Sequence, residues 1–149
     1  MPAYSGRDVL IEFAIGDENA SPGSLTFLTL GMMRGKGMKV TWDKADATAD
    51  KSPQFTKQSL TTFKMVEFSG DGVSYTEAIH NQATLKAHIY NPGVSTGNQP
   101  KAWIRQTAPD GVTIGPFTFS EWDSASPYAD VVTWSTTAES NGAVTFTPA

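Results

Sequence analysis

Alternating apolar and polar side chains predict that most of this chain forms β-strands. Met38, Val40 and Trp42, for example, are separated by single polar residues, and a period of two is typical of a strand with one buried face. Clusters of Gly, Pro, Asn and Asp separate such stretches. The pattern predicts strands at residues 9–15, 24–30, 38–43, 60–69, 85–90, 102–107, 112–122, 130–138 and 143–147.

The predicted strand at residues 60–69 carries large apolar side chains on both faces. Phe63 and Met65 lie on one face, and Val66 and Phe68 lie on the other. A strand of this kind needs cover on both sides. In a chain of this size, we expect part of that cover to come from a second subunit.

One short helix is expected near residues 75–83. Ser74 and Glu77 fit a capping box, with the serine as N-cap and the glutamate at the third helical position. Apolar and polar residues alternate again after this helix, which predicts a return to a strand over residues 85–90.

Two turn signals lie in the C-terminal half of the chain. The Ser-Asn-Gly sequence at residues 140–142 predicts a tight hairpin turn that joins the last two strands. Pro116 interrupts the strand predicted at residues 112–122. Because proline cannot donate a hydrogen bond to a neighbouring strand, this position predicts a sheet edge, a bend or a bulge.

Residues 44–59 predict a long loop, because the segment is polar, carries both charges and contains Pro53. Loops of this length are uncommon inside compact domains and are usually functional or disordered. One hypothesis is an exposed surface excursion. The other is a loop that folds against a neighbouring subunit, with Phe55 as its apolar anchor. The second hypothesis assigns intersubunit contacts to Lys44, Asp46, Asp50, Lys51, Phe55 and Lys57.

The composition favours a single domain over residues 1–149. Hydrophobic residues make up 39% of the chain, which is enough for one buried core. No apolar run approaches the ~18 residues of a membrane-spanning helix, and the first residues do not resemble a signal peptide. We therefore expect a soluble product made in the cytoplasm. The absence of cysteine excludes disulfides and cysteine-ligated zinc.

Charge is unevenly distributed along the chain, whose formal net charge is -4. Residues 34–67 carry seven Lys or Arg against four Asp or Glu, whereas residues 106–149 carry five Asp or Glu and no Lys or Arg. Two explanations stay open: ordinary scatter, or complementary surfaces for a head-to-tail contact between copies. The acidic balance does not favour a basic face that grips nucleic-acid phosphates.

No arrangement of residues predicts an active site or a metal site. His80 and His88 lack patterned Asp, Ser or Glu neighbours, and no Gly-x-Ser-x-Gly nucleophile motif is present. The spacing of Asp43, Asp46 and Asp50 does not match a calcium-binding loop. We expect a protein that is not an enzyme and that uses no cofactor or metal.

Several segments of the chain resemble one known family. Gly6–Ile11 resembles the start of that family, where a short arm, here residues 1–8, leads into the first strand. Asp130–Thr136 and Asn141–Phe146 resemble its closing hairpin. The family is that of the major tail tube proteins of siphophages, which include lambda-like members; the other segments that carry the resemblance are Thr26–Arg34, Met38–Thr48 and Phe63–Gly72.

The resemblance implies a β-sandwich or barrel-like tail tube fold with one short flanking helix and a long stacking loop. In this family, subunits form hexameric rings, their inner strands join into a continuous barrel, and stacked rings form the conduit for viral DNA in the virion. The long loop contacts the neighbouring ring. The expected partners are other copies of the chain, the tape measure protein and double-stranded DNA in the lumen, and the tail terminator and tail tip proteins.

An acidic lumen would repel DNA phosphates and prevent tight binding from stalling ejection. Glu67, Glu121, Asp123 and Asp130 are the candidate lumen carboxylates, because they flank predicted strands. The alternative function is a monomeric β-sandwich that binds carbohydrate or a receptor, and a small β-fold enzyme is a third. The binding-module alternative predicts a stable monomer that does not polymerise.

Overall fold

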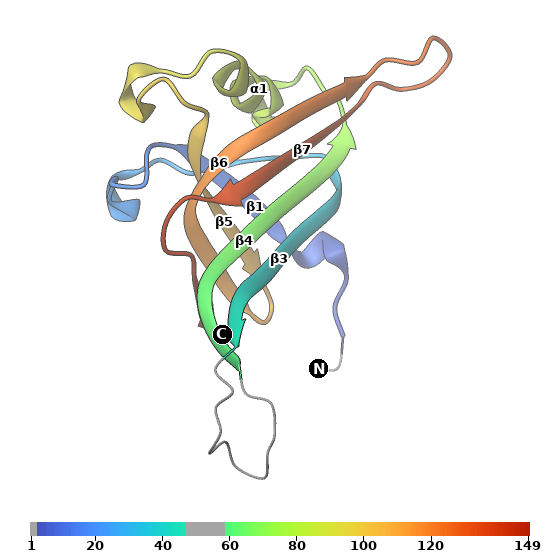
Figure 1. Cartoon of the computed structure of the whole chain (residues 1–149). Helices are drawn as coiled ribbons and strands as arrows, with labels where there is room; N and C mark the ends of the chain where they lie inside the picture. Colours follow the sequence, from blue (N-terminus) through green and yellow to red (C-terminus); the bar gives the residue numbers. More distant parts are fainter. Residues whose placement is uncertain (1–2, 47–58) are drawn as a thin grey trace, which may run out of the picture.

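A single antiparallel sheet dominates the computed structural model, which describes residues 3–46 and 59–149. Within these ranges eight strands follow the order β2-β1-β5-β6-β7-β4-β3, with β8 beside β6. Figure 1 shows β3, β4 and β7 in front of β1 and β5, so the sheet bends over itself. The predicted mainly β fold is confirmed. The strands are β1 (Leu10–Ile15), β2 (Leu28–Thr29), β3 (Met33–Asp46), β4 (Ser59–Val73), β5 (Lys101–Ala108), β6 (Gly111–Ala125), β7 (Thr133–Ser140) and β8 (Thr145–Pro148).

The core lies between the two halves of the bent sheet. Phe13 on β1 and Ile104 on β5 meet Phe68 on β4 and Trp134 on β7 in one buried cluster. Leu85 reaches the same cluster from the helix. Alternate strand residues supply these side chains, as the period-two pattern predicts. Burial of this apolar surface is the main source of stability in a chain without disulfides.

The helix lies seven residues later in the chain than the capping box predicts. It is α1 (Gln82–Tyr90), so both the helix at residues 75–83 and the strand at residues 85–90 were wrong predictions. The backbone N–H of Ser74 donates to the Val132 carbonyl at 2.8 Å, so this residue joins the loop between β6 and β7. Leu85 and His88 are buried at helical spacing, a period that the apolar alternation at 85–90 concealed.

A buried glutamine ties the segment before α1, which includes the 3-10 helix Ala78–His80, to neighbouring backbone groups. The Gln82 Oε1 atom accepts a hydrogen bond from the Tyr75 backbone N–H at 2.8 Å. Its Nε2 atom donates to the carbonyls of Gly31 at 3.0 Å and Val73 at 2.9 Å. One side chain therefore satisfies three backbone groups that would otherwise need other partners. These long-range bonds leave no signal in the local sequence.

The last two strands do not form the predicted hairpin. β7 and β8 both pair with the same side of β6, β7 through residues from Phe117 onward and β8 through Gly111–Ile114. Residues 141–144 are therefore a break between two successive partners of β6. Pro116 faces this break, and its carbonyl accepts a hydrogen bond from Asn141 N at 2.9 Å. The irregularity predicted at Pro116 is confirmed. At this break β6 has no strand partner that would accept a hydrogen bond from a backbone N–H at the proline.

Three other strand boundaries differ from the prediction. The strand expected at residues 24–30 is reduced to β2, because Pro22–Ser24 forms a 3-10 turn. β3 and β4 are longer than predicted and continue as a two-stranded hairpin to the pair Asp46 and Ser59. The loop expected at residues 44–59 is therefore wrong at both ends. Of its predicted contact residues, Lys44 and Asp46 lie on β3, while Asp50, Lys51, Phe55 and Lys57 lie outside the described residues.

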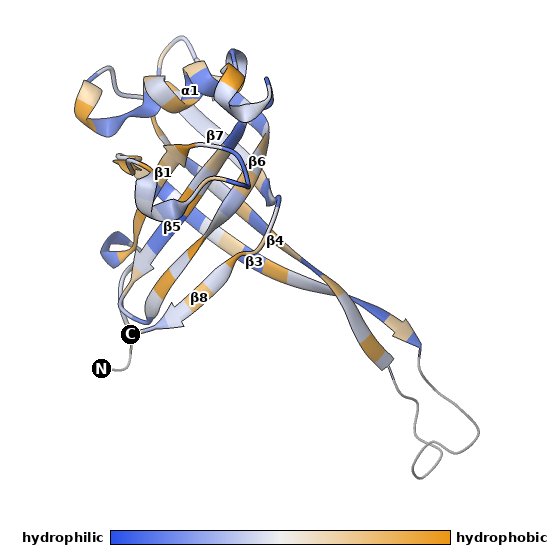
Figure 2. Cartoon of the chain, turned by 90° about the vertical axis from the view of Figure 1, so that its left-hand side faces the viewer, coloured by the Kyte–Doolittle hydropathy of each residue, from blue (hydrophilic) through white to orange (hydrophobic). Residues whose placement is uncertain are grey.

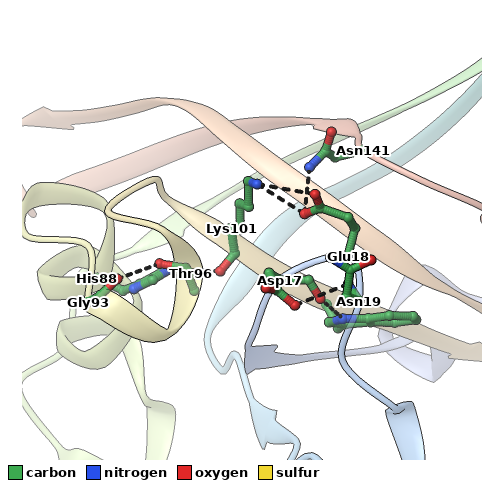
Figure 3. A network of polar contacts seen from close by, with 9 residues as sticks. Asp17, Glu18, Asn19, His88, Gly93, Thr96, Lys101 and Asn141 are labelled. Carbon is green, nitrogen blue, oxygen red and sulfur yellow. Dashed lines mark hydrogen bonds and ion pairs between the residues drawn. The ribbon is translucent and has the colours of Figure 1, made fainter.

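A polar network ties the loop after β1 to the body of the sheet (Figure 3). Glu18 forms an ion pair with Lys101 at 3.0 Å and accepts a hydrogen bond from the Asn141 side chain at 3.1 Å. The Trp103 indole N–H donates to the Asp17 carbonyl at 2.8 Å. The network therefore joins the start of β5 to the break between β7 and β8.

Replacing Glu18 by glutamine is expected to make stability less sensitive to acid. Backbone and Lys101 hydrogen bonds lower the pKa of Glu18 in the folded chain. The Glu18 carboxylate therefore stabilises the folded chain at pH values above the pKa that Glu18 has when unfolded. This stabilisation is lost as the pH falls through the lower pKa that Glu18 has when folded. Urea unfolding at several pH values should give a smaller acid-induced loss for Glu18→Gln, with Glu77→Gln as control. An unchanged acid dependence would contradict this role.

Candidate functional site

The four strands β3, β4, β7 and β6 present one uncovered face. Val66, Phe68, Trp134 and Ala138 point into the core, so the residues between them point away from it. Asp71, Glu121 and Asp123 on these outward positions are exposed to solvent. By register and alternation, the face comprises Gly35, Gly37, Lys39, Glu67, Ser69, Asp71, Thr118, Glu121, Asp123, Thr133, Ser135, Thr137 and Glu139.

Carboxylates dominate the charge of this face, among small Ser, Thr and Gly residues. Glu67 pairs with Lys39 on one side and with Glu139 on the other. Four residues further along β4, Asp71 pairs with Ser135, which pairs with Asp123. Carboxylates from β4, β6 and β7 thus share one surface, where like charges lie across neighbouring strands.

Three of the four candidate carboxylates come together here. Glu67, Glu121 and Asp123 lie on the uncovered face, whereas Asp130 lies beyond the strand ends, in the turn between β6 and β7. The Asp130 carboxylate accepts a hydrogen bond from the Val131 N–H at 2.7 Å. Sequence reasoning missed Asp71 and Glu139. The period of two, continued from Glu67 through 69 to 71 and from 137 to 139, would have found both.

Two open hollows lie on the uncovered face. A Cβ atom added at Gly35 would lie 2.1 Å from the Asp71 Oδ1 atom, so a larger residue there would displace this carboxylate. The hollow next to it is lined by Gly35, Gly37 and Ser135 among other small residues. A second hollow is bordered by Arg34 and Asp123. Such a surface presents charge and small polar groups to whatever passes it.

Two backbone edges at the sides of this face are unpaired within the described residues. Among the described strands β3 pairs only with β4, so its other edge has no strand partner along residues 33–45. β6 pairs with β5 only as far as Thr118, and the Phe119 N–H still donates to the Pro100 carbonyl at 2.9 Å. Beyond that bond, the same edge of β6 is open to Ala125. Long open edges favour pairing with another chain.

The β3–β4 hairpin extends beyond the body of the subunit (Figure 2). β4 pairs with β7 only from Glu67 onward, so its first half has β3 as its sole strand partner in the described chain. Phe63 on this half is 76% exposed. The predicted lack of cover on a two-sided apolar strand is thus seen directly. An isolated two-stranded ribbon with exposed apolar groups indicates a contact surface.

The histidines have ordinary structural contacts. His88 is buried, and its Nε2 atom lies 2.8 Å from the Lys101 carbonyl; the His80 ring packs edge-on against Tyr75 at 5.3 Å. Across residues 3–46 and 59–149, no group of three or more His, Asp or Glu side chains could hold a metal ion. In the same ranges, no helix has the length and apolar character needed to cross a membrane.

Solved structures with the same fold come from a phage tail tube and from gene transfer agent particles. The tail of an empty gene transfer agent particle matches with 23% identity and a TM-score of 0.71, over 97% of this chain and 99% of that chain. A native gene transfer agent virion matches with 19% identity and a TM-score of 0.73, over the same shares. The SPP1 tail tube matches with 12% identity and a TM-score of 0.63, over 99% of this chain and 80% of that chain. The fold is therefore that of phage-type tube subunits.

The family follows from the sequence itself. A family model described as phage tail tube protein matches residues 3–146, so the chain belongs to the phage tail tube protein family. No curated protein sequence matches the chain. The predicted family is confirmed, and the chain is a structural subunit of a virion tail tube.

Proposed function

We propose that copies of this chain close into rings by pairing β3 of one copy with the open part of β6 in the next. The observation that carries this proposal is the pair of open edges on opposite sides of the uncovered face. β3 is antiparallel to β4, β4 to β7 and β7 to β6. β3 and β6 therefore run in opposite directions, so their pairing between copies continues the antiparallel order.

Ring closure accounts for edges that a free subunit leaves exposed. A sheet closed on itself has no edge, and an all-antiparallel barrel satisfies the backbone groups of every strand. The gene transfer agent tail that shares this fold has C6 symmetry, which supports a ring of six copies for this chain. Such rings stack into a tube that conducts viral DNA during ejection into the host.

The uncovered face becomes the lumen wall in this ring. Its carboxylates, including Glu67, Glu121 and Asp123, repel phosphates and let DNA pass without sequence-specific binding. The tape measure protein occupies the same channel before DNA, and the tail terminator and tail tip proteins cap the two ends. The chain is synthesised in the host cytoplasm and acts as a structural protein without catalysis.

Reversing charge on the lumen face is expected to slow DNA transit without preventing tube assembly. In particles that carry Glu121→Lys with Asp123→Lys, each ring repeats the change, so passing phosphates meet rings of cations. Ejection followed by a DNA-binding dye should be at least several-fold slower than in wild-type particles. The control, Asp17→Lys with Glu77→Lys, makes the same net charge change off this face. Equal ejection rates in both variants would contradict the lumen assignment.

A further inference from the structure

Exposed apolar side chains gather at both ends of the four-strand face. At one end, the turn between β6 and β7 exposes Tyr128, Val131 and Val132; we name this group the turn patch. At the other end, the extended hairpin exposes Val40, Trp42 and Leu60; we name this group the hairpin patch. Contiguous exposed apolar groups of this kind mark interaction sites.

Strand directions place the two patches at opposite ends of the subunit. The hairpin joins the end of β3 to the start of β4, whereas the turn patch joins the end of β6 to the start of β7. Because β4 and β6 run in the same direction, the end of β6 lies opposite the start of β4. Figure 1 shows the β6–β7 turn and the described end of the β3–β4 hairpin at opposite ends of the sheet. Copies stacked along the strands would therefore bring one patch to the other.

The charges beside the turn patch and the hairpin patch are complementary. Asp123 and Asp130 lie beside the turn patch, in a segment from 106 to 149 with no Lys or Arg. Lys44 and Lys64 lie on the hairpin, within a segment that has an excess of basic residues. The Lys64 Nζ atom lies 6.0 Å from the Trp42 ring centroid, so a cation accompanies the largest apolar group of the patch.

A cavity beside the hairpin patch offers room for an incoming side chain. It has a volume of about 310 Å³, and Val40, Val66 and Val144 contribute to its wall. Gln106 lines the same cavity, and its Oε1 atom has no hydrogen-bond donor in the described part of the subunit. An aromatic hydroxyl such as that of Tyr128 matches this environment, because it combines apolar area with a donor.

We propose that the turn patch of one copy docks onto the hairpin patch of a copy in the adjacent ring. This inference rests on the proposed tube function and names the two surfaces that make rings stack. The docking buries Tyr128 against Trp42 and Leu60, with the turn carboxylates facing the hairpin lysines. It also gives the stack a direction, since each ring presents the hairpin patch at one end and the turn patch at the other.

Cysteine crosslinking tests this docking directly, because the chain has no cysteine of its own. Tubes are assembled from a Leu60→Cys/Tyr128→Cys variant and treated with a short bismaleimide. The expected product is a ladder of covalent multimers on a reducing denaturing gel. Single Leu60→Cys and Tyr128→Cys variants should give no ladder. The matched control is Leu60→Cys/Val94→Cys, because Val94 is apolar and exposed but lies outside the turn patch.

The outcomes distinguish a failure of the proposed docking from a failure of the proposed function. A ladder confined to the Leu60/Tyr128 pair supports the docking. Tubes that form without this ladder, or that give it only with the Val94 control, overturn the docking and leave the tube function intact. A wild-type chain that forms no tubes under any assembly condition overturns the tube function and the docking with it.

Discussion

Replacing Lys39 by proline and replacing Val40 by proline are expected to have different effects, because one variant loses subunit stability and the other loses tube formation. Along β3, successive residues direct their N–H groups alternately toward β4 and toward the open edge. One of the two prolines therefore removes an internal bond, at a cost of about 1–3 kcal/mol for the group left without a partner. The other removes a donor that only a neighbouring subunit would use, and its ring obstructs that neighbour.

The two effects are measured separately. Urea unfolding gives the stability of each subunit, and negative-stain electron microscopy shows whether tubes form. Val94→Pro is the control, since Val94 is the first residue of a short 3-10 helix, a position that tolerates proline. Normal tubes from the proline variant that keeps wild-type stability would mean that the open edge of β3 is not an interface.

Trp134→Ala is expected to be among the most destabilising single changes in the described core. Trp134 is 2% exposed, stacks on Trp122 with ring centroids 5.0 Å apart, and donates its indole N–H to the Val73 carbonyl at 3.3 Å. Truncating a buried Trp costs about 3–5 kcal/mol. That loss is a large fraction of the roughly 5–15 kcal/mol that stabilises a typical domain.

Trp42→Ala provides the contrast for this prediction. Trp42 is 49% exposed and lies on the hairpin, so its truncation should change subunit stability by less than about 1 kcal/mol while impairing assembly. Urea unfolding of both variants measures the difference. Equal losses would show that the hairpin tryptophan belongs to the core of the subunit, contrary to its exposure.

The β character of the chain could be predicted because period-two alternation is a local property. Val66 and Phe68 are buried while Phe63 is exposed on the same strand, as the two-sided pattern of residues 60–69 indicated. The helix could not be placed, because Leu85, Ala87 and Ile89 alternate as in a strand, although Leu85 and Ile89 also share one face of a helix. Long-range bonds from Gln82 select the helical outcome, and no local pattern encodes them.

The closing strands show a second limit of local reasoning. An Asn-Gly pair between two β-rich segments favours a hairpin, yet β7 and β8 both pair with β6. The length of β6 decides this outcome, since one strand is long enough to accept two partners in succession. For the candidate site, strand register brought Glu67 and Glu121 to one face and left Asp130 in a turn. The open edges became visible only once each strand had its partners assigned.

A helical cryo-electron microscopy reconstruction of tubes assembled from this chain tests the central claim most directly. The account predicts that β3 of each subunit is hydrogen-bonded to the part of β6 beyond Phe119 in its ring neighbour, with Glu67 and Glu121 facing the lumen. A ring in which these two edges face solvent, or in which the carboxylate face lies on the outside of the tube, would contradict it.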